Sequence, residues 1–226
     1  MKIITDAVQA GQKSLSEYDS KQVLAAYDIP VTKERLVRTW EDLRQAARDI
    51  GYPLVLKGCD SEIAHKTEKG LIKVDIRNEQ EAQAAFEHII KEVNPDKGAV
   101  LVQEMVKGTR ELVVGLTRDP QFGPCVMFGL GGIFTEILRD VSFRVAPLEK
   151  RDALEMMEEI KGHKILDAVR GMPAADRDTL AHMLISVGRI GLEQDAIKEI
   201  DINPVILSEG RPLAVDALMV LEESST

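Results

Sequence analysis

Cysteines, aromatic residues and long apolar runs are scarce in this chain of 226 residues, and each shortage excludes a class of protein. The two cysteines, Cys59 and Cys125, give neither a disulfide framework nor the spacing of a metal site. No apolar run approaches the roughly 20 residues of a membrane span, and the N-terminal sequence MKIITD lacks the apolar core of a secretion signal. We therefore expect a cytoplasmic protein with no membrane partner.

An excess of basic residues is also missing. The chain has 29 lysines and arginines against 38 aspartates and glutamates, which gives a net charge of −9. Binding to a phosphate backbone requires clustered lysine and arginine, so we expect no nucleic-acid partner. A hydrophobic content of 44% is ordinary for a globular protein, and the length suffices for one sizeable core or two small domains.

Strand and helix patterns alternate through the first hundred residues. Ser16, Thr39 and Asn78 each precede an acidic residue by three positions, which is typical of a helix start. Apolar strand patterns lie at 54–57, 71–76 and 99–104. This alternation predicts an α/β fold with helices packed on a mixed sheet. The segment Lys107–Thr109 is the first plausible boundary, so we expect domains 1–106 and 107–226.

The stretch from Leu54 to Ile76 carries the first candidate site. Lys57 ends an apolar strand and offers a point charge suited to a phosphate oxygen, and the Gly70 end of the following loop supplies backbone N–H groups for the same anion. His65 lies between them, and histidine can accept a phosphoryl group covalently. The alternative is an ordinary surface loop, because no phosphate-loop motif of familiar spacing is present.

A second candidate site lies near the C-terminus. A strand period of two places Glu199, Asp201 and Asn203 on one face. If the chain reverses at Glu209-Gly210, Asn203 lies opposite Asp216, and this pair suits Mg²⁺. A slip of one residue would move Asp216 to the other face. An edge hairpin whose polar residues face solvent is the alternative.

Several motifs occur in an order that resembles one protein family. They are Lys57 on its strand, HKTEKG at 65–70, VQEM at 102–105, RELVVG at 110–115, GLGGIFTE at 129–136, DVSFRVAP at 140–147 and EIDINP at 199–204. Together they resemble the β subunit of ADP-forming acetyl-CoA (acyl-CoA) synthetase, a relative of the succinyl-CoA synthetase β subunit, over residues 15–220. The resemblance implies an ATP-grasp fold, in which two subdomains, each a sheet flanked by helices, hold a nucleotide in the cleft between them.

The resemblance also implies roles for individual residues. Lys57 and Gly70 would contact nucleotide phosphate, and Glu111 would lie near the ribose and phosphates. Glu104, with the backbone of Met105 and Val106, would form the hinge that reads adenine.

The remaining implied roles concern phosphoryl transfer. Asn203 and Asp216 would hold Mg²⁺, and Asp201 would face the phosphoryl carrier. His65 would pass a phosphoryl group between a partner's phosphohistidine and ADP. One departure is that the loop ends Gly70-Leu71-Ile72 where the group often has Gly-Gly-Val, which affects the expected phosphate contacts.

The implied reaction is acyl-CoA + ADP + phosphate = acid + CoA + ATP, with ATP or ADP and Mg²⁺ as cofactors. The partner would be an α subunit that carries the CoA-binding and ligase domains in an α2β2 assembly and binds most of the CoA and acid. A carboxylate–amine ligase of the ATP-grasp type and a non-catalytic nucleotide-binding module are the alternatives. The sequence names neither the acyl group nor the preference for ADP over GDP.

Overall fold

The computed structural model describes residues 1–59, 70–94, 98–132 and 140–222. The chain forms two compact units. Residues 32–106 make up the central unit. Residues 1–31 and 107–226 together make up the discontinuous unit, whose two parts are separated in the sequence by the central unit.

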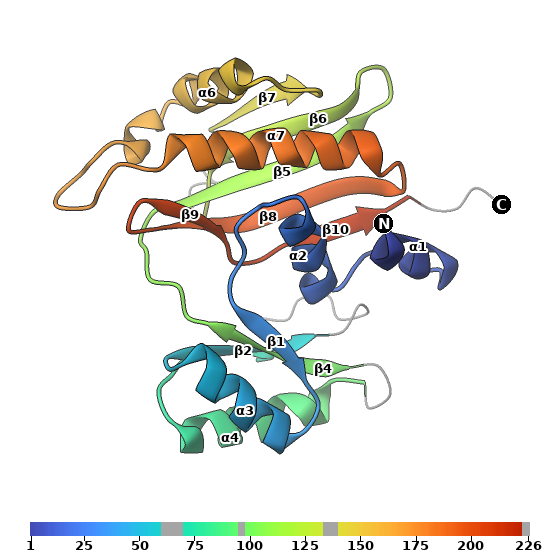
Figure 1. Cartoon of the computed structure of the whole chain (residues 1–226), viewed down its shortest axis with the longest axis vertical. Helices are drawn as coiled ribbons and strands as arrows, with labels where there is room; N and C mark the ends of the chain where they lie inside the picture. The colour runs from blue at the N-terminus through green and yellow to red at the C-terminus, as the bar shows by residue number, and fades with distance from the viewer. Residues whose placement is uncertain (60–69, 95–97, 133–139, 223–226) are drawn as a thin grey trace. The chain divides into compact units, whose positions relative to one another are not determined.

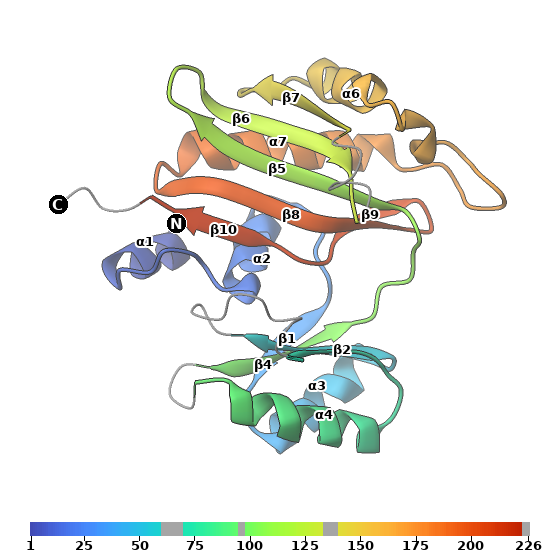
Figure 2. The same cartoon turned by 180° about the vertical axis from the view of Figure 1, so that it is seen from behind.

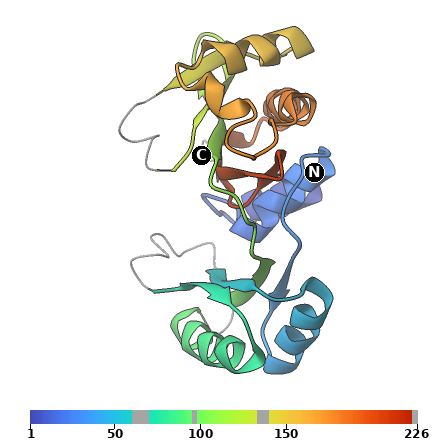
Figure 3. The same ribbon diagram turned by 90° about the vertical axis from the view of Figure 1, so that its left-hand side faces the viewer.

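The central unit is a four-stranded sheet with helices on one face (Figures 1 and 3). The strand order is β1-β4-β2-β3, and the pairs β1–β4, β2–β3 and β2–β4 are all antiparallel. In chain order its elements are β1 (Glu34–Val37), α3 (Trp40–Ile50), β2 (Leu54–Cys59), β3 (Ile72–Ile76), α4 (Glu79–Glu92) and β4 (Ala99–Glu104).

Local sequence explains where these helices begin. The Thr39 hydroxyl accepts a hydrogen bond from the Asp42 N–H, and the Asn78 side chain accepts one from the Glu81 N–H. Each bond satisfies a backbone donor that the first turn of a helix leaves open, so the predicted helix starts are confirmed. The apolar faces of α3 and α4 then pack on Leu54, Leu56 and the other core residues of the sheet.

The discontinuous unit is built on a six-stranded sheet of order β10-β8-β5-β6-β7, with β9 paired to β8. The helices α6 and α7 cover one face of this sheet (Figure 2). Its elements are α1 (Lys2–Gln9), α2 (Glu17–Ala26), β5 (Glu111–Asp119), β6 (Gly123–Leu130), β7 (Val141–Val145), α6 (Lys150–Glu159), the short helix η1 (His163–Leu166), α7 (Arg177–Glu193), β8 (Ile197–Ser208), β9 (Arg211–Ala214) and β10 (Leu218–Leu221).

The N-terminal segment differs from the predicted division of the chain. The Leu15 N–H donates to the Met219 carbonyl at 2.9 Å, and the Leu221 N–H donates to the Lys13 carbonyl at 2.8 Å. Residues 1–31 therefore belong with 107–226 and not with 32–106. The predicted boundary after residue 106 coincides with the end of the central unit.

Within the described part of the chain, no helix has the length and apolar character needed to cross a membrane.

Candidate functional site

Lys57 lies on the face of the central sheet opposite to α3 and α4. Its neighbour Leu56 contributes to the core beneath those helices, and successive side chains of a strand point to opposite faces. The residue is only 5% exposed. It pairs with Leu101 of β4 and Ile72 of β3. Packing on both sides therefore fixes the position of a cationic side chain, as the predicted phosphate contact requires.

The predicted adenine hinge follows β4 in the central unit. The Glu104 carboxylate accepts a hydrogen bond from the Lys33 N–H at 2.7 Å, and the Glu104 N–H donates to the Lys33 carbonyl at 3.0 Å. The Met105 N–H donates to the Pro53 carbonyl at 3.2 Å. These N–H groups are thus engaged within the protein, and the role of Glu104, Met105 and Val106 as an adenine hinge stays a prediction.

His65 lies in residues 60–69, outside the described residues, so its predicted role stays a prediction. Gly70, where the description resumes, has a φ of +67°, a left-handed conformation that favours glycine. A Cβ atom at Gly70 would lie 3.8 Å from Nε2 of His88 on α4. The backbone at this end of the loop thus has a conformation that suits glycine, and the phosphate contact of Gly70 stays a prediction.

Glu111 begins β5 in the discontinuous unit, and the glycine-rich segment after β6 packs directly against it. The Gly131 N–H donates to the Glu111 carbonyl at 2.8 Å. A Cβ atom at Gly132 would lie 2.5 Å from Oε2 of Glu111. The glycines thus permit the close approach of two backbones at a predicted nucleotide contact. The rest of this segment, 133–139, lies outside the described residues.

The C-terminal hairpin has the predicted register. Ser208 pairs with Arg211, and the ladder continues to the pair Val205–Ala214. Glu209 and Gly210 have φ angles of +49° and +80°, as a two-residue hairpin turn requires. The Val215 N–H then donates to the Pro204 carbonyl at 3.1 Å, which continues the same register.

Asn203 and Asp216 are the next pair in that register. The strand β9 itself ends at Ala214, so Asp216 lies on a short connector, Val215–Ala217, that leads into β10. Asn203 is exposed and Asp216 is half-buried. The register that the predicted metal pair needs is therefore present, and its role as a metal site stays a prediction.

Negative charge gathers around Asp201. This residue lies mid-sheet on β8, where it pairs with Gly115 of β5 and Leu218 of β10. Burial raises the pKa of the Asp201 carboxyl above its usual value, and the charges of Glu199 and Asp216 raise it further. A cation bound between these carboxylates would relieve the repulsion.

The donor chemistry fits Mg²⁺ held together with a nucleotide. Among the described residues, no group of three or more histidines, cysteines, aspartates and glutamates is placed to hold a metal by itself. Mg²⁺ commonly uses one or two protein oxygens, with water and substrate phosphates as its other ligands. The Asn203 amide and the Asp216 carboxylate are oxygen donors of this kind.

Sequence reasoning missed Lys21, which lies on α2 beneath the connector that carries Asp216. Its side chain is fully buried and bonds to both Glu17 and the Val215 carbonyl. The spacing of Glu17 and Lys21 at i and i+4 was visible in the sequence. That spacing usually marks an exposed helix pair, so it gave no signal of burial.

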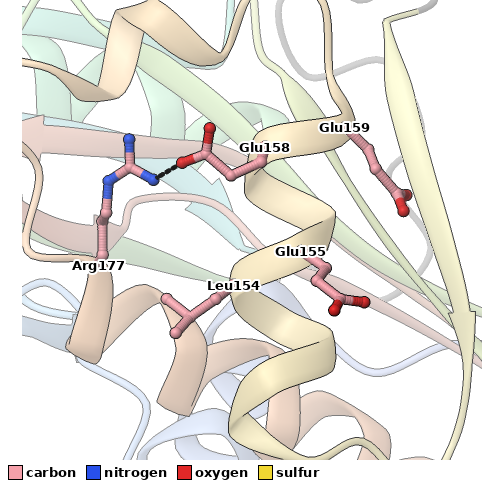
Figure 4. Close-up of a pocket in the computed structure, with 5 residues that line it drawn as sticks. All are labelled: Leu154, Glu155, Glu158, Glu159 and Arg177. Carbon is pink, nitrogen blue, oxygen red and sulfur yellow. Dashed lines mark hydrogen bonds and ion pairs between the residues drawn. The ribbon is translucent and has the colours of Figure 1, made fainter.

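A hollow of about 450 Å³ lies beside α6 and the start of α7, and none of the predicted site residues lines it (Figure 4). Its lining includes Glu158 and Arg177, which form an ion pair, and Glu159, which pairs with Arg144. The charges here are satisfied within the protein. We therefore assign this hollow no part in the site.

Comparison with known proteins identifies the fold family. A profile of the ATP-grasp domain matches residues 6–221. This chain belongs to the ATP-grasp family. The β subunit of ADP-forming acetate–CoA ligase I from Pyrococcus furiosus is 44% identical to it over 223 residues, which cover 96% of each chain. The β subunit of ligase II from the same organism is 39% identical over 98% of each chain. Within the ATP-grasp family, this chain therefore groups with these β subunits, and the predicted fold and resemblance are confirmed.

Solved structures agree with this grouping. Ca. Korarchaeum cryptofilum dinucleotide forming acetyl-coenzyme A synthetase 1, in complex with coenzyme A, Ca-AMPCP and HgCl⁺, has a TM-score of 0.92 and 43% identity, covering 98% of this chain and 99% of that one. The same protein with coenzyme A and Mg-AMPPCP, at a TM-score of 0.87, has a phosphohistidine segment that points towards its nucleotide binding site.

Proposed function

We propose that this chain is the nucleotide-binding β subunit of an ADP-forming acyl-CoA synthetase. Acyl-CoA, ADP and phosphate would be converted reversibly to the free acid, CoA and ATP. The observation that carries the proposal is the match to β subunits over nearly their whole length, because it extends beyond a shared nucleotide-binding domain.

In this proposal the described residues bind and orient the nucleotide. Lys57 supplies a fixed positive charge for phosphate oxygens. Glu104, with the backbone of Met105 and Val106, forms the hinge that reads adenine, and Glu111 lies near the ribose and phosphates. Asn203 and Asp216 would hold Mg²⁺, which when bound neutralises charge on the phosphates. Preorganised charges of this kind supply most of the stabilisation of phosphoryl transfer.

His65 would carry the phosphoryl group. A ring nitrogen of His65 attacks phosphorus on the partner's phosphohistidine, and the P–N bond to that histidine breaks. A β-phosphate oxygen of ADP then attacks the same phosphorus, the P–N bond to His65 breaks, and ATP forms. Asp201 would be the acidic residue that faces the phosphoryl carrier, as the family resemblance implies.

The partner would be an α subunit with CoA-binding and ligase domains, assembled as α2β2 in the cytoplasm. In Archaeoglobus fulgidus a 42% identical segment is part of a longer chain, of which this protein spans 30%. Relatives at 37% and 33% identity are named for 4-hydroxybutyrate and for trans-feruloyl-CoA. Because the acid varies while this segment is kept, we propose that the partner selects the acyl group.

Labelling with γ-labelled ATP tests the role of His65. The assembled complex should form an acid-labile phosphoprotein on this chain, and His65→Ala should abolish it. His88→Ala is the matched control, since His88 lies beside Gly70 and should leave the label intact.

Equal labelling of this chain after His65→Ala would remove His65 from the mechanism. Turnover with no acid-labile species at all would favour the carboxylate–amine ligase. If Mg-ADP raises the melting temperature of this chain but no α subunit gives activity with it, a non-catalytic nucleotide-binding module is favoured.

A further inference from the structure

A buried ion pair lies beneath the predicted metal segment. Lys21 and Glu17 are on consecutive turns of α2, and the Lys21 Nζ lies 3.1 Å from Oε1 of Glu17. Their side chains are 0% and 2% exposed. Burying two charges is costly, and apolar residues of similar size often stabilise a protein equally well or better. Stability alone therefore gives no reason for this pair.

The second contact of Lys21 suggests what the pair does. The Lys21 ammonium donates a hydrogen bond to the Val215 carbonyl at 3.2 Å. Val215 directly precedes Asp216 on the connector between β9 and β10. The Ala214 N–H donates to the Pro30 carbonyl at 2.9 Å, so the segment after α2 also holds the end of β9, directly before this connector. The contact from Lys21 thus holds backbone that is outside the regular strands, and the contact from Pro30 holds the strand residue just before it.

We infer that Lys21 is a positioning residue for the Mg²⁺ site. It fixes the Val215 peptide and so orients the Asp216 carboxylate opposite Asn203. This inference rests on the proposed function, because it assumes that Asp216 binds the cation.

An ammonium suits this task in a way that an apolar side chain does not. It has three N–H donors, so it can bond to the Val215 carbonyl and to Glu17 at the same time. Glu17 neutralises the charge of Lys21 within the same helix. The contact therefore adds no net positive charge beneath a segment that is expected to attract a cation.

The double variant Glu17→Leu/Lys21→Met tests the inference. It replaces the pair with apolar residues that can fill the buried space, so we expect the chain to fold. We would measure two midpoints. The first is the Mg²⁺ concentration that gives half of the ADP-dependent rise in melting temperature, and the second is the Mn²⁺ concentration that gives half-saturation of binding by electron paramagnetic resonance. Loss of a residue that supports a metal ligand typically weakens metal affinity 10- to 100-fold, so we expect both midpoints to rise about tenfold.

Met157→Ala is the control for a general loss of stability, since Met157 is buried in α6 of the same unit. It should lower the melting temperature without changing either midpoint. A double variant with wild-type midpoints would overturn the inference while leaving the proposed function in place. If wild-type protein shows neither Mg²⁺-dependent ADP binding nor a signal from bound Mn²⁺, both the inference and the proposed function are overturned.

Discussion

At the scale of single residues, the predicted site combines side chains whose surroundings differ in kind. Lys57 is held by a tightly packed sheet, whereas Asp201 lies among like charges. Both arrangements cost folding free energy, the first because a cationic side chain is buried and the second because a carboxylate lies beside like charges. Charge crowding of this kind is common where a protein keeps a binding site at the expense of stability.

Asp201→Asn should stabilise the protein in the absence of Mg²⁺. A carboxyl whose pKa is raised on folding loses stability as the pH rises from its ordinary pKa of 3.8 through the raised value. Asparagine does not titrate, so we expect the variant to melt about 2–4 °C higher than wild type at pH 7 and to lose this advantage at low pH. Thermal melts between pH 3.5 and 8 in EDTA provide the measurement. An advantage that does not change with pH would contradict the argument, and phosphoryl transfer should fall in the same variant.

Gly132→Ala should weaken nucleotide binding by moving Glu111. The new Cβ would lie 2.5 Å from the Glu111 carboxylate, and the backbone φ is +62°. Gly123→Ala is a matched control, because its φ is +76° and no atom lies within 4 Å of the new Cβ. Each substitution should cost about 1–2 kcal/mol from the left-handed backbone. Calorimetry with Mg-ADP should show weaker binding only for Gly132→Ala, and equal affinities would show that Glu111 does not contact the nucleotide.

At the scale of secondary structure, a half-buried arginine holds the ends of elements in the discontinuous unit. Arg118 on β5 donates to the carbonyls of Gly191 at 2.6 Å, Ile197 at 2.7 Å and Gln194 at 3.0 Å. These carbonyls belong to the last turn of α7, its cap and the start of β8. Arg118 therefore satisfies acceptors that the end of a helix leaves open.

Arg118→Met should destabilise the protein by about 2–4 kcal/mol, because it removes charge-assisted hydrogen bonds and leaves buried carbonyls without that donor. Hydrogen exchange should accelerate first at 190–197. Arg151→Met is the comparison, since Arg151 is 85% exposed and pairs with Glu155 on the surface of α6. That change should leave the stability nearly unchanged, because water screens an exposed ion pair. If the two variants lose similar amounts of unfolding free energy, Arg118 does not hold the end of α7 as assigned.

Elements fixed by local sequence could be predicted. The helix starts at Ser16, Thr39 and Asn78 follow from side chains that bond to the N–H three residues on, and the hairpin register follows from the turn at 209–210. The burial of Lys21 could not be predicted, because the same Glu–Lys spacing occurs on exposed helices.

At the scale of the whole molecule, the division of the chain depends on pairing between residues that are far apart in sequence. Ser14 forms a β-bridge with Val220, and nothing near residue 14 specifies a partner some 200 positions later. The sequence therefore predicted the boundary at 106 but placed residues 1–31 in the wrong unit.

Removal of residues 1–15 should destabilise the discontinuous unit selectively. The deletion exposes the backbone of β10 that now pairs with Lys13 and Leu15, and an uncovered strand edge favours aggregation. Hydrogen exchange should show lost protection in β10 and β8, with α3, α4 and β4 unchanged. Unchanged protection in β10 would show that the N-terminal pairing adds little, and equal losses in both units would show that they unfold together.

The split of one unit around another has a consequence during synthesis on the ribosome. The central unit is continuous in sequence and has its own core, so the nascent chain can complete it once residue 106 has emerged. The N-terminal 31 residues, although translated first, must wait for β10, the last strand to be made. A ribosome stalled before Leu218 would therefore display a finished inner domain flanked by an N-terminal segment that still lacks its strand.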